Sequence, residues 1–320
     1  MNPRIPRRTL LASTLGGALA SSRLSALAAP QPSAPPVARS EQQAPDWQPV
    51  EQALGVSGQL MDGGVFRVGM LRSDLKVTVR DVTLAAAFAL GSYAAFFQTA
   101  GQAMVMGDLV LLDEEVNPVM SGLFQAGFSI SGLHNHLNEM TPHVMYLHYM
   151  GMGDPVQLAQ GLRQALSASA TPLGQAPAGT PQAAAAPTTD LPVDQIGQAL
   201  GRPTKVAKGG VVQISVPRAE TITDNGISLL PAMGVATALN FQPTGTGQAA
   251  ITGDFVMVAS EVNPVAQALR RAGIDVTALH NHHLGEDPRL FYMHFFATGD
   301  ATQLAQGLRV ALDKTNSKQP

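Results

Sequence analysis

The sequence of 320 residues contains no cysteine. This excludes a disulfide scaffold, a thiolate metal site, a cysteine nucleophile and a lipid anchor on an N-terminal cysteine. Aromatic residues make up only 5% of the chain and charged residues 13%, whereas 45% of the residues are hydrophobic. That composition suffices for hydrophobic cores and carries too little charge for a disordered chain. The length favours about two domains.

The first 28 residues have the pattern of an export signal. Arg7 and Arg8 precede an apolar run over 10–20, which is too short to span a membrane, and small residues at 26–28 fit a cleavage site. The adjacent arginines indicate a twin-arginine signal, and an ordinary secretory signal is the alternative. We therefore expect the mature protein to be periplasmic or secreted, soluble after cleavage, and without a stable membrane anchor.

Signal cleavage also changes the charge balance. The remaining chain has 16 basic and 23 acidic residues, a net charge of −7. An acidic surface argues against nucleic acid and against anionic membranes, since both need basic patches. The partner classes that remain are a metal ion or a small molecule, and nothing in the composition indicates an oligomeric state.

Two segments are rich in alanine and proline, together with serine and glutamine or threonine. We interpret them as a spacer and a linker, because they cannot bury enough apolar surface to become ordered. The expected division is a signal peptide at 1–28, a spacer at 29–45, a first repeat domain at 46–166, a linker at 167–192 and a second repeat domain at 193–315.

The two bodies are repeats of each other. A shift of 146 positions aligns them without a gap, and 29 of 60 positions are identical between 107–166 and 253–312. The matching strings include Gly-Asp, Glu-Val-Asn-Pro-Val, Leu-His-Asn-His and Gln-Leu-Ala-Gln-Gly-Leu-Arg. Identity at this level indicates an internal duplication.

Within one repeat, hydrophobic periodicity and turn signals predict alternating helices and hairpins. We expect Asn117 to cap a helix that begins at Pro118 and Asp154 to cap a later helix. The expected helices are 47–54, 118–127 and 154–166, and the expected strands are 65–71, 94–99, 103–112, 128–137 and 144–150. Hairpins with interspersed helices predict an α+β fold with antiparallel sheets, duplicated in tandem.

All eight histidines lie in two windows, 134–148 and 280–294. Residues two apart on a strand share a face, so His134 and His136 are expected to project together, with His148 and Tyr146 joining them from the next strand. The second repeat repeats this face with His280, His282, Tyr292 and His294. His143 and His283 have no counterpart, since they align with Arg289 and Leu137, and are expected in a loop or at the surface.

Three histidines on one face suit a divalent transition metal such as zinc, copper, iron or manganese. Among the acids, Glu115 and Glu261 are equivalent in the two repeats and are the carboxylates expected to complete the site. The pattern leaves open whether each repeat holds one ion or the two repeats share one. The alternative is a purely structural hydrogen-bond network of histidines in an envelope protein.

The Glu-Val-Asn-Pro, Leu-His-Asn-His and Tyr-x-x-His strings, followed by Gly-Asp and Leu-Ala-x-x-Leu-Arg, resemble the LppY/LpqO family, a bacterial domain of unknown function named from mycobacterial lipoproteins. The resemblance covers both repeats and implies an exported envelope protein but no particular activity. A bicupin is a second resemblance, since His280-x-His282 with Glu286 looks like a cupin metal motif. These patterns predict an exported protein that binds a metal ion or small ligand, and leave open whether it is an enzyme.

Overall fold

The computed structural model describes residues 45–99, 101–174 and 187–319. The expected signal peptide at 1–28, nearly all of the spacer and the middle of the linker lie outside the described residues. No helix among the residues described is long and apolar enough to cross a membrane. Residues 44–320 belong to one structural unit, within which the two repeats contact each other.

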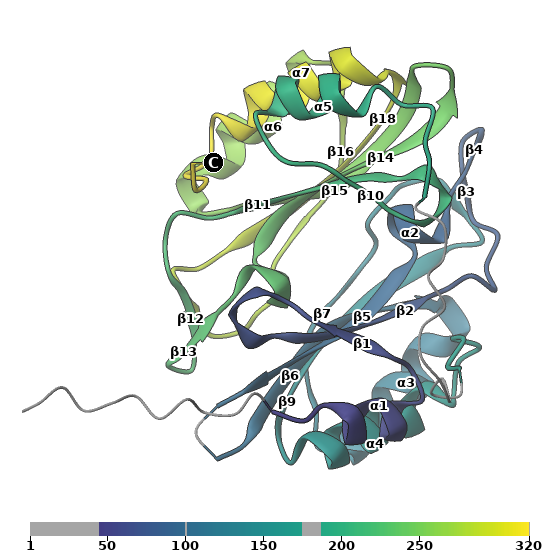
Figure 1. Cartoon of the computed structure of the whole chain (residues 1–320), viewed down its shortest axis with the longest axis vertical. Helices are drawn as coiled ribbons and strands as arrows, with labels where there is room; N and C mark the ends of the chain where they lie inside the picture. The colour runs from purple at the N-terminus through teal and green to yellow at the C-terminus, as the bar shows by residue number, and fades with distance from the viewer. Residues whose placement is uncertain (1–44, 100, 175–186, 320) are drawn as a thin grey trace, which may run out of the picture. The chain divides into compact units, whose positions relative to one another are not determined.

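The first repeat is built on a six-stranded antiparallel sheet with one face covered by helices (Figure 1). Its strands, in spatial order, are β1 (Gly58–Leu60), β2 (Phe66–Leu71), β5 (Gly91–Gln98), β6 (Ala103–Leu112), β9 (Val144–Gly153) and β7 (Ser129–His134). The helices are α1 (Gln48–Leu54), α2 (Ala86–Ala89), α3 (Asp113–Gln125) and α4 (Pro155–Leu166), with a 3₁₀ turn η1 (Asp62–Gly64). A small sheet joins β4 (Val82–Thr83), β3 (Thr78–Val79) and β8 (Met140–Thr141).

The second repeat has the same strand order. Its sheet runs β10 (Lys205–Val206), β11 (Val212–Pro217), β14 (Ala236–Gly245), β15 (Gln248–Met257), β18 (Phe291–Asp300) and β16 (Asp275–His280). The helices are α5 (Val193–Leu200), α6 (Ala259–Arg271) and α7 (Ala301–Leu312), with 3₁₀ turns η2 (Lys208–Gly210) and η3 (Pro231–Met233). The small sheet joins β13 (Ile227–Leu229), β12 (Ile222–Asp224) and β17 (Glu286–Asp287). The α+β class, the antiparallel sheets and the tandem duplication are thereby confirmed.

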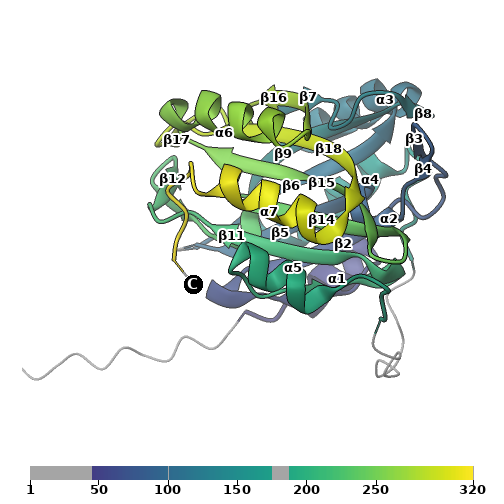
Figure 2. The ribbon, with the colours of Figure 1, turned by 90° about the horizontal axis from the view of Figure 1, so that it is seen from above.

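The two large sheets face each other (Figures 1 and 2). Helices α1, α3 and α4 cover the outer side of the first sheet and α5, α6 and α7 that of the second, whereas α2 contacts β5 of its own repeat and β14 and β15 of the other. Each repeat has its own core between sheet and helices. Two further buried clusters combine residues of both repeats. One contains Tyr146 and Phe296, and the other contains Met106 and Tyr292. Hydrogen bonds also join the repeats, from Arg67 to the Ala232 carbonyl (2.6 Å) and from the Thr277 hydroxyl to the His136 carbonyl (2.6 Å).

The structure corrects two sequence expectations. Helix α3 begins at Asp113, so Asn117 is not its cap and Pro118 lies inside the helix. The helix starts earlier because the Glu115 carboxylate accepts the backbone N–H of Leu112 (2.9 Å), which satisfies a donor at the helix N-terminus. In addition, the repeats are offset by 145 positions between β3 and β5, as Thr78 pairs with Thr141 where Thr223 pairs with Asp287.

A candidate metal centre between the repeats

The three equivalent histidine pairs meet in the space between the two sheets. His134 ends β7 and pairs across the hairpin with Tyr146, which is the expected register. His148 lies on β9, and His136 follows β7 in a loop that the Thr277 hydroxyl of the other repeat holds in place. His280, His282 and His294 occupy the corresponding positions on and after β16 and on β18.

The imidazoles are interleaved across the repeats. His134 stacks on His280 with ring centroids 3.5 Å apart. His136 stacks on His294 at 3.7 Å, and His148 stacks on His282 at 3.8 Å. The last two pairs are equivalent when the repeats are exchanged, so an approximate two-fold axis passes through the group. The six histidines form one centre and not two separate sites.

Every Nε2 atom of the six histidines is buried and has no hydrogen-bond partner among the described residues. In three of them the other ring nitrogen, Nδ1, faces a backbone carbonyl: Gly253 for His294 (2.8 Å), Asn135 for His134 (3.2 Å) and Asn281 for His280 (3.4 Å). An N–H at Nδ1 leaves the lone pair on Nε2. This arrangement is typical of histidines that bind a metal through Nε2.

Two aspartates complete the donor set, and sequence reasoning missed both. Asp108 pairs with His148 in the β6–β9 ladder, and its carboxylate oxygens lie 3.7 Å from Nε2 of His136 and 3.9 Å from Nε2 of His148. Asp254 repeats this with His282 (3.5 Å) and His294 (3.9 Å). A signal was available, because an aspartate within an apolar strand recurs after the same glycine in both repeats.

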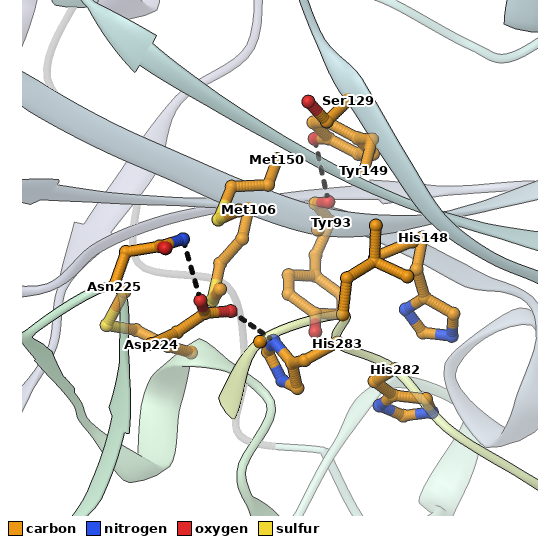
Figure 3. A pocket seen from close by; sticks show the side chains of 15 residues that line it. Tyr93, Met106, Ser129, His148, Tyr149, Met150, Asp224, Asn225, His282 and His283 are labelled. Carbon is orange, nitrogen blue, oxygen red and sulfur yellow. Dashed lines mark hydrogen bonds and ion pairs between the residues drawn. The ribbon is translucent and has the colours of Figure 1, made fainter. Parts of the chain in front are cut away.

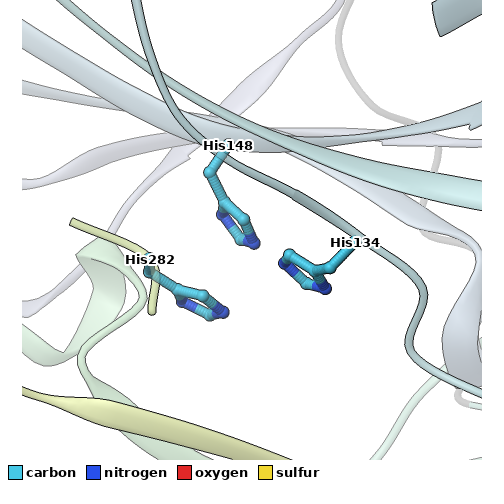
Figure 4. Close-up of side chains that lie close together, drawn as sticks. All are labelled: His134, His148 and His282. Carbon is cyan, nitrogen blue, oxygen red and sulfur yellow. The ribbon is translucent and has the colours of Figure 1, made fainter. Parts of the chain in front are cut away.

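The described donors can be grouped into sets whose ligand atoms lie within 4.8 Å of one another. Three sets consist of histidines and one includes an aspartate: His134 with His148 and His282 (Figure 4), His134 with His136 and His294, His280 with His282 and His294, and Asp108 with His136 and His148. Two of the all-histidine sets draw on both repeats. The donors are imidazole nitrogens and carboxylate oxygens, which suit zinc, copper, nickel, iron and manganese.

Burial dominates the electrostatics of this centre. It lowers the pKa of His134 to about 4 and that of His280 to about 3. The other four histidines are also shifted well below their ordinary pKa by burial, reinforced by neighbouring histidines. Burial raises the pKa of Asp108 to about 7 and raises that of Asp254 well above its ordinary value. The positive charge of Arg67 partly opposes the shift at Asp108, but among the described residues neither aspartate forms an ion pair with a lysine or arginine. A metal ion's positive charge would stabilise such a group of neutral imidazoles and buried carboxylates.

Glu115 and Glu261 do not belong to this group. The Glu115 carboxylate binds the buried guanidinium of Arg72 (2.6 Å) and accepts backbone N–H groups of Leu112 (2.9 Å) and Ala170 (2.8 Å). Glu261 forms the same contacts with Arg218 (2.7 Å) and Val258 (2.9 Å). The carboxylates that lie beside the histidines are therefore those of Asp108 and Asp254, not the expected Glu115 and Glu261. Glu115 and Glu261 anchor a helix start to a strand end.

Two further expectations concern residues near the centre. Glu286 is not placed with the histidines as in a cupin motif, since its carboxylate accepts the Leu290 N–H (3.0 Å) and binds Arg289 (3.3 Å). His143 is exposed and bonds Asp113 (2.7 Å), as expected of a surface histidine. His283 lies in a loop, as expected, and is buried there with only 7% of its surface exposed.

Comparison with known families finds a match to the model described as Domain of Unknown Function (DUF1259), over residues 48–168 and again over 194–314. No curated protein matches. Similar solved structures include a trimeric bacterial microcompartment shell protein, PduB, at 13% identity, and EtuB from Clostridium kluyveri, at 10%. Each comparison covers 81% of this chain and 90% of the other chain, with a TM-score of 0.20, which is too low to relate the folds.

Proposed function

The chain belongs to the DUF1259 family, in two tandem copies, and we propose that it holds a divalent transition-metal ion in a centre shared by the copies. The observation that carries this proposal is the convergence of six buried Nε2 atoms without hydrogen-bond partners. A buried polar atom without a partner costs about 1–3 kcal/mol. Six such atoms in one place are best explained by a metal ion that binds them.

The alternative of a structural histidine network is less well supported. Such a network stabilises a core only if its members hydrogen-bond to one another. Here the Nε2 atoms of His136 and His148 approach Asp108 only to 3.7 and 3.9 Å, beyond hydrogen-bonding distance. The rings stack face to face, and among the described residues no hydrogen bond joins one of these rings to another, so they do not form such a network.

The decisive experiment is the metal content of the mature protein, purified from an exporting host without an affinity tag of histidines. We expect one ion on the approximate axis or two ions related by it. The ions should be lost when His134, His136, His280 and His282 are all replaced by alanine. His143→Ala is the matched control, because this histidine belongs to the same hairpin but is exposed and bonds Asp113. A folded protein that contains no metal and takes up no zinc, copper, iron or manganese would refute the proposal.

We further propose that the protein acts in the periplasm or outside the cell, as the LppY/LpqO resemblance implies. The support is the arginine pair, the short apolar run and the small residues at 26–28. Changing Arg7 and Arg8 to lysine together should retain the precursor in the cytoplasm if the twin-arginine route is used. Continued export of this variant would instead indicate an ordinary secretory signal.

A further inference from the structure

A cavity of about 200 Å³ lies beside the candidate metal centre (Figure 3). The first repeat contributes Tyr93, Met106 and His148 to its wall, and the second contributes Asp224 and His283. The cavity therefore lies between the large sheet of one repeat and the small sheet of the other. His148 and His282 line it as well as belonging to the metal centre, so a molecule in the cavity would lie next to that centre.

The duplication shows that this wall is specific to the second repeat. Asp224 pairs with Glu286 where Val79 pairs with Met140 in the first repeat, so the two positions correspond. His283 likewise corresponds to Leu137. In the first repeat the three residues are apolar and lie in one buried cluster with Phe296. In the second repeat they are polar, yet exposed by only 1% at Asp224, 7% at His283 and 5% at Glu286.

Asp224 remains incompletely bonded in this buried position. Its Oδ1 accepts a hydrogen bond from the Asn225 side chain (2.9 Å). Its Oδ2 has no hydrogen-bond partner among the residues that the structure describes, and Nδ1 of His283 lies 3.5 Å from it. Glu286, by contrast, is satisfied by Leu290 and Arg289. A buried carboxylate oxygen without a partner is costly, and it is retained most readily where a ligand supplies the donor.

We propose that this cavity binds a small molecule with a cationic amine head and an apolar body. Oδ2 of Asp224 accepts the hydrogen bond of the ammonium group. Met106, Met150 and Met233, which also line the cavity, pack against the apolar part. The amine selectivity does not depend on the metal. Only the position of the ligand beside a metal ion rests on the proposed function.

Calorimetric titration with three molecules of equal shape tests this directly: isoamylamine, isoamyl alcohol and isovalerate. Each is titrated into the mature protein as purified and after removal of metal with a chelator, with metal content measured in both samples. We expect the amine to bind in the millimolar range, at least about tenfold more tightly than the alcohol or the acid. Asp224→Asn keeps the acceptor for Asn225 and removes the charge, and should weaken amine binding about tenfold or more.

The matched control is Asp287→Asn, which makes the same charge change at an exposed position on the small sheet and should leave amine binding unchanged. Equal binding of the three probes, no amine binding, or an unchanged affinity in Asp224→Asn would overturn the inference. A protein that contains metal but does not bind the amine would refute this inference alone. One that binds the amine but never holds metal would refute only the proposed metal centre.

Discussion

His134 and His280 occupy equivalent positions in the two repeats and stack on each other, with ring centroids 3.5 Å apart. A residue that stacks on its own counterpart lies next to the axis that exchanges the repeats. One copy of the domain supplies one ring of this pair and half of the aspartates. The complete donor set therefore exists only when both copies are joined face to face.

Replacing His136 and His148 together with alanine should remove all bound metal, although both belong to the first repeat. These residues stack on His294 and His282, so the change disrupts both halves of the shared centre. Metal analysis per protein chain measures the result. Independent sites, one in each repeat, would instead leave half of the metal bound.

Asp108→Asn should weaken metal binding about tenfold to a hundredfold while leaving the metal-free protein as stable as before, or more so. The asparagine has nearly the same shape but cannot supply an anionic oxygen to the metal. In the metal-free protein it removes the cost of burying a carboxylate, the same cost that raises the pKa of Asp108 to about 7. Competition with a chromogenic chelator gives the affinity, and thermal unfolding of the metal-free protein gives the stability. Unchanged affinity would exclude Asp108 as a ligand.

Glu115→Gln should destabilise the fold by about 3 kcal/mol at neutral pH without changing the metal content, because it removes the buried carboxylate partner of Arg72 and leaves the partly exposed Asp74 to pair with that buried charge. Asp74→Asn is the control on the same arginine, since Asp74 is partly exposed and its loss should cost less. If Glu115→Gln folded normally but lost its metal, Glu115 would be a metal ligand after all.

The same ion pair predicts a dependence of stability on pH. Burial alone would raise the pKa of Glu115, but hydrogen bonds from Arg72, Ala170 and Leu112 outweigh it and lower the pKa. A carboxylate whose pKa is lower in the folded chain contributes stability above the unfolded pKa of about 4.3 and loses it as the pH falls through the folded pKa. The stability difference between the natural protein and Glu115→Gln, measured by urea unfolding, should therefore shrink in acid. A constant difference down to acidic pH would contradict this account.

Gly107→Ala should destabilise the protein by about 1–3 kcal/mol, since its Cβ would collide with the Tyr93 carbonyl oxygen and the Tyr149 hydroxyl. Gly69→Ala is the control in the same sheet, because nothing lies within 4 Å of its added Cβ. Denaturant unfolding compares the two. An equal loss of stability in the two variants would mean that the atoms around Gly107 can move to make room for a methyl group. The position next to Asp108 would then not require glycine.

Much of the fold was predictable because it depends on local signals. The expected strand at 103–112 coincides with β6, and Tyr146 and His148 lie on the strand next to His134, as expected. Helix α3 was misplaced because Asn117-Pro118 has the pattern of a helix start, whereas the helix begins at Asp113, where the Glu115 carboxylate accepts the Leu112 N–H. The register offset of 145 could not be detected because only 4 of 21 positions are identical between 78–98 and 223–243.

The sequence by itself determined the duplication, the α+β class and that His134 and His148 lie on neighbouring strands, because these follow from repeated strings and from the pattern of the strands. Only the tertiary structure decided that the two faces oppose each other and form one centre. It also decided that Asp108 and Asp254 join that centre, while Glu115 and Glu261 bind arginines instead. The reason is physical: strand parity gives the direction of a side chain relative to its own sheet. What it meets across the interface depends on how two sheets pack, and no local pattern encodes that packing.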